Sequence, residues 1–143
     1  LFQAMQHGGL TSMTQIRAED PDWQTLGLDD FEHYTLEQLS AISKAHNCRA
    51  VVHGAITRFT PYPHLTVGLK LRLIDLNTGQ TGWAFEYIWD TADKATLERL
   101  EEFYTLKNSF GITKSQDRLG SVSSIKLMKF VAFETSQTLS PIK

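Results

Sequence analysis

The sequence has little of what several classes of protein require. Cysteine occurs once, at Cys48, so no disulfide can form within the chain and no cysteine-based zinc site can be built. The uninterrupted apolar runs are only a few residues long, too short for a membrane-spanning helix. Lysine and arginine are not clustered and the net charge is -2, so no nucleic-acid partner is expected.

The chain also lacks the motifs of common catalytic and metal sites. There is no GxSxG, GxxxxGK[ST] or GxGxxG sequence. The histidines do not form an HxH or HExxH spacing, and they stand at His7, His33, His46, His53 and His64. We therefore expect no catalytic residues, no metal, no cofactor and no enzymatic activity.

Two other features could form sites but have simpler interpretations. Cys48, at a helix-to-strand junction, is interpreted as a small buried hydrophobe rather than a nucleophile. An acidic cluster lacks the ligand spacing of a calcium loop, so a solvated loop is the preferred interpretation. Its members are Asp20, Asp22, Asp29, Asp30 and Glu32.

Length and composition are those of one ordinary globular domain, with 41% hydrophobic and 21% charged residues among 143. We interpret residues 1–143 as a single α/β domain. Because the chain opens on Leu1-Phe2-Gln3 in what resembles the middle of a helix, we expect an amino-terminal segment of the full-length protein to precede it. A signal peptide or a lipid-attachment cysteine would lie in that segment.

Helical patterns occupy both ends and one internal stretch. Residues 1–8 resemble the end of a helix, and Thr35 with Gln38 has the capping-box pattern of a helix that runs to about Asn47. Asp93 can cap a helix to about Lys107, and residues 123–139 form a last helix that is apolar on several sides. The stretches 20–33 and 108–124 are predicted to be loops, and residues 11–19 a short strand.

Three strands are predicted in succession, near 49–59, 65–75 and 82–89. In "LTVGLKLRL" the alternation is complete, with leucines and valine from Leu65 to Leu73 on one face, and Lys70 and Arg72 on the other. The expected fold is an α/β (α+β) sandwich: a mixed sheet with a three-strand antiparallel meander and helices packed on it.

The third strand presents an aromatic row, Trp83, Phe85, Tyr87 and Trp89. The row is either core beneath a helix or a surface ladder that binds a partner. The core interpretation is preferred if the Leu65–Leu73 row lies beside it on the same face.

The first two strands are joined by a stiff corner. Proline lacks an N–H and fixes its own φ, so Pro61 and Pro63 hold the chain extended and end the ladder there. The corner is either an interaction site, because a rigid arm loses less entropy on docking, or only a rigid turn that protects a sheet edge. The candidate interaction residues are Phe59, Pro61, Tyr62, Pro63, His64, Lys70 and Arg72.

The sequence around these strands resembles a group of periplasmic and outer-membrane lipoprotein domains related to the curli-secretion lipoprotein. The matching pieces are Cys48–Gly54, Tyr62-Pro63, Leu69–Asp75, Thr78-Gly79 and Trp83, and the apolar carboxy-terminal helix also fits. The resemblance covers about residues 35–140, with Cys48-Arg49 in place of the usual Ala-Asp and His64 in place of a third proline.

The resemblance implies a periplasmic, outer-membrane-associated domain with an anticodon-binding-domain-like fold. Such domains are non-catalytic components of secretion or appendage assemblies, often in oligomeric rings. For this chain, the expected partners are further copies of itself and other envelope proteins. Its only link to a membrane would be a lipid anchor outside this sequence. The alternatives are a soluble periplasmic module that binds a small ligand or nucleotide, and an enzyme whose site lies in the preceding segment.

Overall fold

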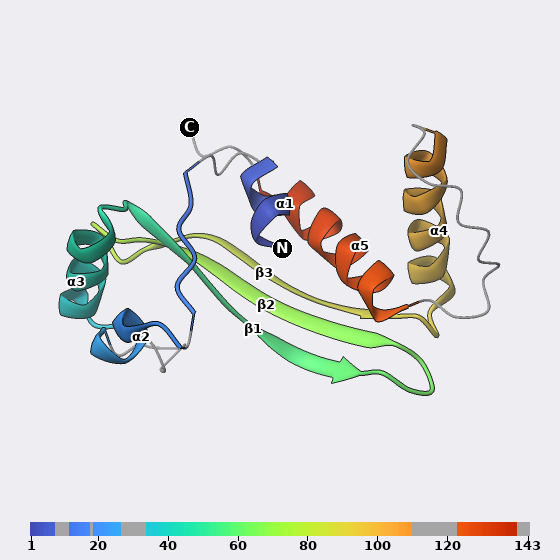
Figure 1. Ribbon diagram of the computed structural model, residues 1–143, viewed down its shortest axis with the longest axis horizontal. Coiled ribbons are helices and arrows are strands. Elements are labelled where there is room, and N and C mark those ends of the chain that lie inside the picture. Colours follow the sequence, from blue (N-terminus) through green and yellow to red (C-terminus); the bar gives the residue numbers. More distant parts are fainter. Residues whose placement is uncertain (8–11, 18, 27–33, 110–122, 140–143) are drawn as a thin grey trace.

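The computed structural model describes residues 1–7, 12–17, 19–26, 34–109 and 123–139. In these ranges the chain forms one three-stranded sheet with helices packed on it (Figure 1), so the predicted α/β fold class is confirmed. The elements are α1 (Phe2–His7), α2 (Pro21–Thr25), α3 (Leu36–His46), β1 (Ala50–Thr60), β2 (Thr66–Asp75), β3 (Thr81–Asp90), α4 (Lys94–Ser109) and α5 (Ser124–Gln137).

The sheet has the order β1-β2-β3, and both strand pairs are antiparallel. The three predicted strands are therefore confirmed to within a residue or two. The further strand predicted at 11–19 is wrong for the part that is described, because residues 12–17 have no strand structure. The sheet of the described residues is accordingly antiparallel throughout, rather than mixed.

Helix α3 begins and ends at the residues expected from the sequence, with Thr35 and Asn47 as its caps. The Thr35 Oγ1 atom accepts a hydrogen bond from the Gln38 N–H at 3.2 Å, and Gln38 Oε1 accepts one from the Thr35 N–H at 2.9 Å. This is the predicted capping box. The helix ends at Asn47, which has a left-handed φ of 47°.

The prediction of a loop over 20–33 needs a correction at its start, because residues 21–25 form the short helix α2. Pro21 stands in the first turn, where its fixed φ suits a helix and its missing N–H has no partner to lose. Residues 27–33 lie outside the described part of the chain. So do residues 110–122 of the predicted polar loop before α5.

The predicted carboxy-terminal helices are both present. Asp93 Oδ2 accepts hydrogen bonds from the Thr96 N–H at 3.0 Å and from the Thr96 hydroxyl at 2.8 Å, so it acts as the expected cap of α4. The Ser123 hydroxyl oxygen accepts from the Lys126 N–H at the start of α5. Within the described ranges, no helix combines the length and the apolar character needed to cross a membrane.

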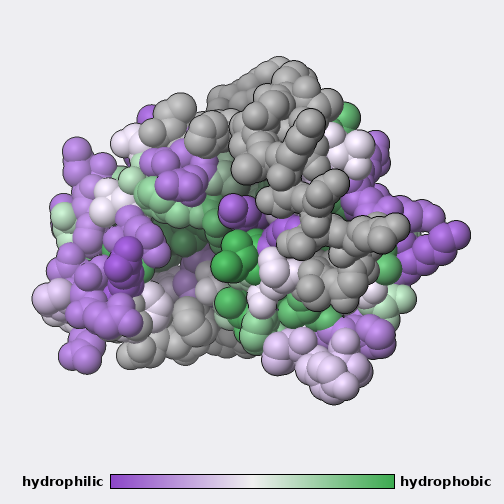
Figure 2. Space-filling model, turned by 45° about the vertical axis from the view of Figure 1, so that its right-hand side comes forward, coloured by the Kyte–Doolittle hydropathy of each residue, from purple (hydrophilic) through white to green (hydrophobic). Residues whose placement is uncertain are grey.

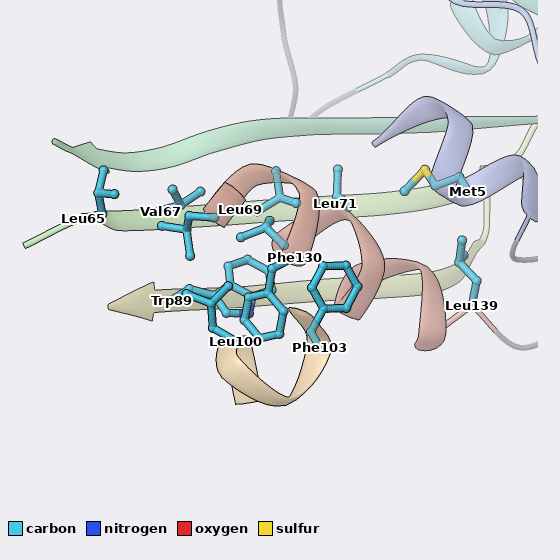
Figure 3. Packing of buried hydrophobic residues seen from close by; sticks show 12 residues of the cluster. Met5, Leu65, Val67, Leu69, Leu71, Trp89, Leu100, Phe103, Phe130 and Leu139 are labelled. Atoms are coloured by element: carbon cyan, nitrogen blue, oxygen red, sulfur yellow. The ribbon is translucent and has the colours of Figure 1, made fainter. Parts of the chain in front are cut away.

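The main core lies between one face of the sheet and the helices α1, α4 and α5. Leu65, Val67, Leu69 and Leu71 stand in a row along β2 beneath α5, with Phe130 among them (Figure 3). Met5 from α1, Leu100 and Phe103 from α4, and Leu127, Phe130 and Val131 from α5 complete the cluster with Trp89 and Leu139. The apolar row predicted for β2 is therefore the centre of the core.

A smaller core lies on the opposite face, at one end of the sheet. Leu39 and Ile42 of α3 pack there on Ile74 and Leu76, and Trp23 and Cys48 lie against the cluster. Cys48 is thus half-buried and apolar in its contacts, as expected. Since α3 covers only this end, the rest of that face carries more polar side chains, among them Lys70 and Arg72.

A partly buried polar contact ties three elements together. The Trp89 indole N–H on β3 donates to Glu134 Oε2 on α5 at 2.6 Å, and Arg99 on α4 donates through Nε to Glu134 Oε1 at 2.8 Å. Because one carboxylate on α5 accepts hydrogen bonds from both β3 and α4, it fixes the positions of these two elements relative to α5. Trp89 is fully buried, so the indole N–H has its partner as buried polar groups require.

The aromatic row of β3 shares the face of the Leu65–Leu73 row, because Leu69 stands opposite Tyr87 and Leu71 opposite Phe85. The core interpretation is therefore favoured, but burial along the row is graded. Trp89 is 0% exposed, Trp83 and Phe85 are half-buried, and Tyr87 is 42% exposed. The helices cover one part of the row and leave another part at the surface.

The register predicts the cost of truncating a core residue. Leu71 is 4% exposed and packs over Gly54 of β1, so Leu71→Ala is expected to lower the free energy of unfolding by about 2–5 kcal/mol. Urea denaturation followed by circular dichroism measures it. The matched control is Leu36→Ala, at a leucine that is 70% exposed, for which the change should stay within about 0.5 kcal/mol. Equal effects of the two variants would contradict the register.

Candidate interaction surface

The proline corner lies at the tip of the sheet, between the end of β1 at Thr60 and the start of β2 at Thr66. Pro61, Tyr62, Pro63 and His64 are all exposed, and Tyr62 is 82% exposed. The corner therefore stands outside the core, as the two prolines predict. A tyrosine held at a tip by neighbouring prolines presents its ring and hydroxyl to any partner with little conformational freedom to lose.

Phe59 precedes the corner and faces the same side of the sheet as α5. It pairs with Val67, and through Val67 with Trp89, whose side chains are in the main core. Phe59 itself is 53% exposed, because β1 is an outer strand and the helices cover the central strand β2 more fully. This candidate is thus an aromatic side chain at the uncovered margin of a core.

Ile56 joins Phe59 and was not among the residues singled out from the sequence. Strict alternation would put residues 56 and 59 on opposite faces, but a bulge between Ile56 and Arg58 inserts one extra residue. Ile56 pairs with Leu69 and is 58% exposed, so it lies on the same margin as Phe59. No sequence signal for the bulge was recognised, since Thr57 fits a strand as well as its neighbours do.

Other apolar side chains are exposed near the start of α5. Ile125 is 69% and Met128 is 40% exposed, whereas Leu127, Phe130 and Val131 are buried. The expectation that α5 has several neighbours is confirmed by its contacts with α1 and α4 and by the core beneath it. Figure 2 shows apolar atoms at the surface in the middle of the molecule, with hydrophilic residues on both sides.

Lys70 and Arg72 lie on the other face of the sheet, away from Phe59 and Ile56. Lys70 stands opposite Ala55 and Glu86, and Arg72 stands opposite His53 and Ala84. Arg72 also donates from Nη2 to the Thr81 hydroxyl oxygen at 3.4 Å. Both side chains are half-buried. The structure therefore separates the candidate residues into two groups, the corner with Phe59 and this pair of cations.

His53 shares the face of the two cations and its ionisation is opposed by the surroundings. Burial lowers the pKa of the imidazole first, and the charge of Arg72 lowers it further. The ring makes an edge-on contact with Tyr34, with centroids 5.6 Å apart. A neutral histidine beside an arginine fits a structural role in the sheet.

This shift predicts a dependence of stability on pH. Because the pKa of His53 in the folded state is below its ordinary value of 6.5, the unfolded chain binds the proton more readily, and stability falls as the pH drops below about 6.5. His53→Gln should remove this part of the slope between pH 7 and pH 5. Denaturant unfolding at several pH values measures it, and an unchanged slope in the variant would contradict the assignment.

The described residues contain no group of three or more His, Cys, Asp or Glu side chains that could hold a metal ion. His46 Nε2 lies 3.3 Å from Asp22 Oδ2, a pair that links α3 to α2. Asp20 Oδ2 accepts a hydrogen bond from the Arg17 N–H at 2.7 Å, which is a loop contact. The acidic positions 29, 30 and 32, and the side chains of His7 and His33, lie outside what the structure describes.

The Cys48 thiol is not activated as a nucleophile. Burial raises its pKa above the ordinary value, so the thiolate is disfavoured at neutral pH. The sulfur lies 3.9 Å from the carbonyl oxygen of Ile42, to which it can donate a weak hydrogen bond. This geometry is that of a packed structural cysteine.

Folding is expected not to depend on a metal ion. Addition of a chelator should leave the melting temperature of the purified chain unchanged, because no cluster of ligands was found in the sequence or in the described residues. Differential scanning calorimetry with and without the chelator measures it. A fall of several degrees that zinc or calcium restores would show a site that this reasoning missed.

Comparison with known proteins gives one structural similarity to report. No protein family and no curated protein matches the sequence. Among solved structures, the fold is similar to the lipoprotein GNA1162 from Neisseria meningitidis, with 15% identity and a TM-score of 0.37. The similar region covers 64% of this chain and 69% of that one. A similarity at this level supports no inference about function.

Proposed function

We propose that this domain is a non-catalytic structural component of a bacterial envelope assembly, which acts through self-association and partner binding. The observation that carries the proposal is the exposed corner. Tyr62 is 82% exposed and Phe59 is 53% exposed, at the tip of a sheet whose central apolar row on β2 is buried. Exposed aromatic side chains on a rigid support are typical of protein–protein contacts.

The location follows from the sequence resemblance. The pieces around Tyr62-Pro63, Leu69–Asp75 and Thr78-Gly79 resemble periplasmic lipoprotein domains related to the curli-secretion lipoprotein. The proposed location is therefore the periplasm, in association with the outer membrane, through a lipid anchor that would lie outside this sequence. In this setting the copies of the domain would form a ring.

A ring requires that each copy use two different surfaces. The corner supplies one of them: Tyr62 would insert its ring into a patch on the next copy, and its hydroxyl would reach a polar group there. Pro61 and Pro63 lack the N–H that a strand ladder needs, so this contact would be made by side chains.

The corner is tested by replacing Tyr62 and Pro63 together with serine. The variant should remain folded, because both side chains lie outside the core, and it should assemble more weakly than the wild type. Circular dichroism measures the fold, and light scattering on the full-length protein measures the mass. Leu36→Ser is the matched control, since it removes a side chain of similar exposure at α3, remote from the corner.

Two results would contradict the proposal. Unchanged assembly of the double variant would show that the corner takes no part in the contact. A wild-type protein that stays monomeric at high concentration would remove self-association altogether, and saturable binding of a metabolite would then favour the ligand-binding alternative.

A further inference from the structure

The outer edge of β1 offers backbone hydrogen-bonding groups that β2 does not use. The Leu76 N–H donates to the Arg49 carbonyl oxygen at 3.0 Å, and bonded pairs recur at every second residue of an antiparallel ladder. With the observed register, residues 51, 53 and 55 therefore bond to β2, and Gly54 and Ile56 point their N–H and C=O groups outward. Beyond the bulge, residues 58 and 60 pair with β2, so Phe59 also points outward.

Of these three residues, Ile56 and Phe59 point their side chains toward the face of α5, and Gly54, which has none, lies between main-core residues on the same face. Gly54 pairs with Leu71, Ile56 with Leu69 and Phe59 with Val67, all in the main core. The uncovered part of the edge thus combines outward backbone groups with two exposed apolar side chains, at 58% and 53% exposure. In the described part of the chain, β1 pairs with no strand but β2.

The beginning of β1 is less accessible. Met13 packs against the main core together with Val52, while Ile16 packs against the smaller core together with Val51. The segment 12–17 therefore passes from one face of the sheet to the other beside these two valines (Figure 1). Pro61 ends the edge at its other side. The accessible stretch runs from Gly54 to Thr60.

We propose that this stretch pairs antiparallel with the same stretch of a second copy, about a two-fold axis next to Ile56. The inference deepens the proposed self-association by naming a contact surface different from the corner. Residues opposite each other in an antiparallel pair have their side chains on one face. Since the outward residues of both copies face α5, the joined sheet carries the helices of both copies on the same side.

The side chains of β1 in one copy are compatible with those that they would face in the second copy. With the bulge counted as one extra residue, Phe59 stands opposite Gly54 of the second copy and Ile56 stands opposite its own equivalent. A Cβ at Gly54 would lie 2.1 Å from Leu71 Cδ2, so the leucine fills this position and offers an apolar surface to the aromatic ring. An aromatic side chain across from a strand glycine is a stabilising cross-strand pair.

The charges on β1 do not oppose the pairing. Arg58 stands opposite Ala55 of the second copy, so no charged residue faces a like charge across the junction. The contact is short and its area is small, which makes the dimer weak and dependent on concentration.

The experiment traps the dimer with a disulfide at the axis. In a Cys48→Ala background, which removes the native thiol, Ile56→Cys should give a covalent dimer on mild oxidation. Opposite Cα atoms in such a pair are about 5.5 Å apart, within the range of disulfides. Ile88→Cys is the matched control, at an isoleucine that is 48% exposed on the outer strand β3. It should remain monomeric under the same conditions.

A second variant tests the backbone contact without a new thiol. Ile56→Pro removes an outward N–H that β2 does not use, so the domain should keep its fold by circular dichroism and lose dimerisation by light scattering. Ile88→Pro, at a corresponding outward position of β3, should leave dimerisation intact. Loss of the dimer in both proline variants would indicate a head-to-tail contact between β1 and β3 and would overturn the two-fold pairing.

The outcomes separate this inference from the proposed function. If the wild type associates, the corner variant weakens association and Ile56→Cys gives no cross-link, then the β1 pairing is wrong while self-association stands. If the wild type is monomeric at every concentration and no cross-link forms, both are wrong. The expected result is a cross-link in Ile56→Cys but not in Ile88→Cys, and loss of the dimer in Ile56→Pro but not in Ile88→Pro.

Discussion

The burial of one face of β2 is the constraint on which the rest of the structure depends. Every odd-numbered residue from Leu65 to Leu73 is at most 9% exposed. The helices α1, α4 and α5 all pack against this row. Burying five such side chains removes enough apolar surface from water to dominate the stability of a domain of this size. The two outer strands are held by their pairing with β2, and they differ in how much cover they share with it.

The helices are placed over this row by polar contacts as well as by packing. Glu134 accepts from the Trp89 indole and from Arg99, so it joins β3, α4 and α5 at one point. The Tyr104 hydroxyl donates to the Lys126 carbonyl oxygen at 3.0 Å and joins α4 to α5 again. The first contact ties α4 and α5 to β3, and the second ties the two helices to each other.

The exposed apolar side chains of the sheet lie on or next to its two outer strands. Ile56, Phe59 and Tyr62 lie on β1 or directly after it, whereas Tyr87 and Ile88 lie on β3. The cationic pair on the opposite face is a separate feature, with Lys70 opposite Glu86 and Arg72 opposite His53. The edge of β1 differs from that of β3 in ending at the proline corner and in carrying two exposed apolar side chains, Ile56 and Phe59, on the helix face beside its outward backbone groups.

Features that arise from near neighbours in the chain could be predicted from the amino-acid pattern. The alternation at 65–73, the capping box at Thr35 and the helical spacing of the last segment are local, so they predicted the strand register, the helix start and α5. The sequence predicted too that the corner is exposed, because proline acts on its own residue and the one before. The tertiary structure alone decided the bulge beside Ile56, the graded burial from Trp89 to Tyr87 and the separation of Lys70 from Phe59. These depend on which helix covers which part of the sheet, and such packing joins residues too distant in sequence for any local pattern to record.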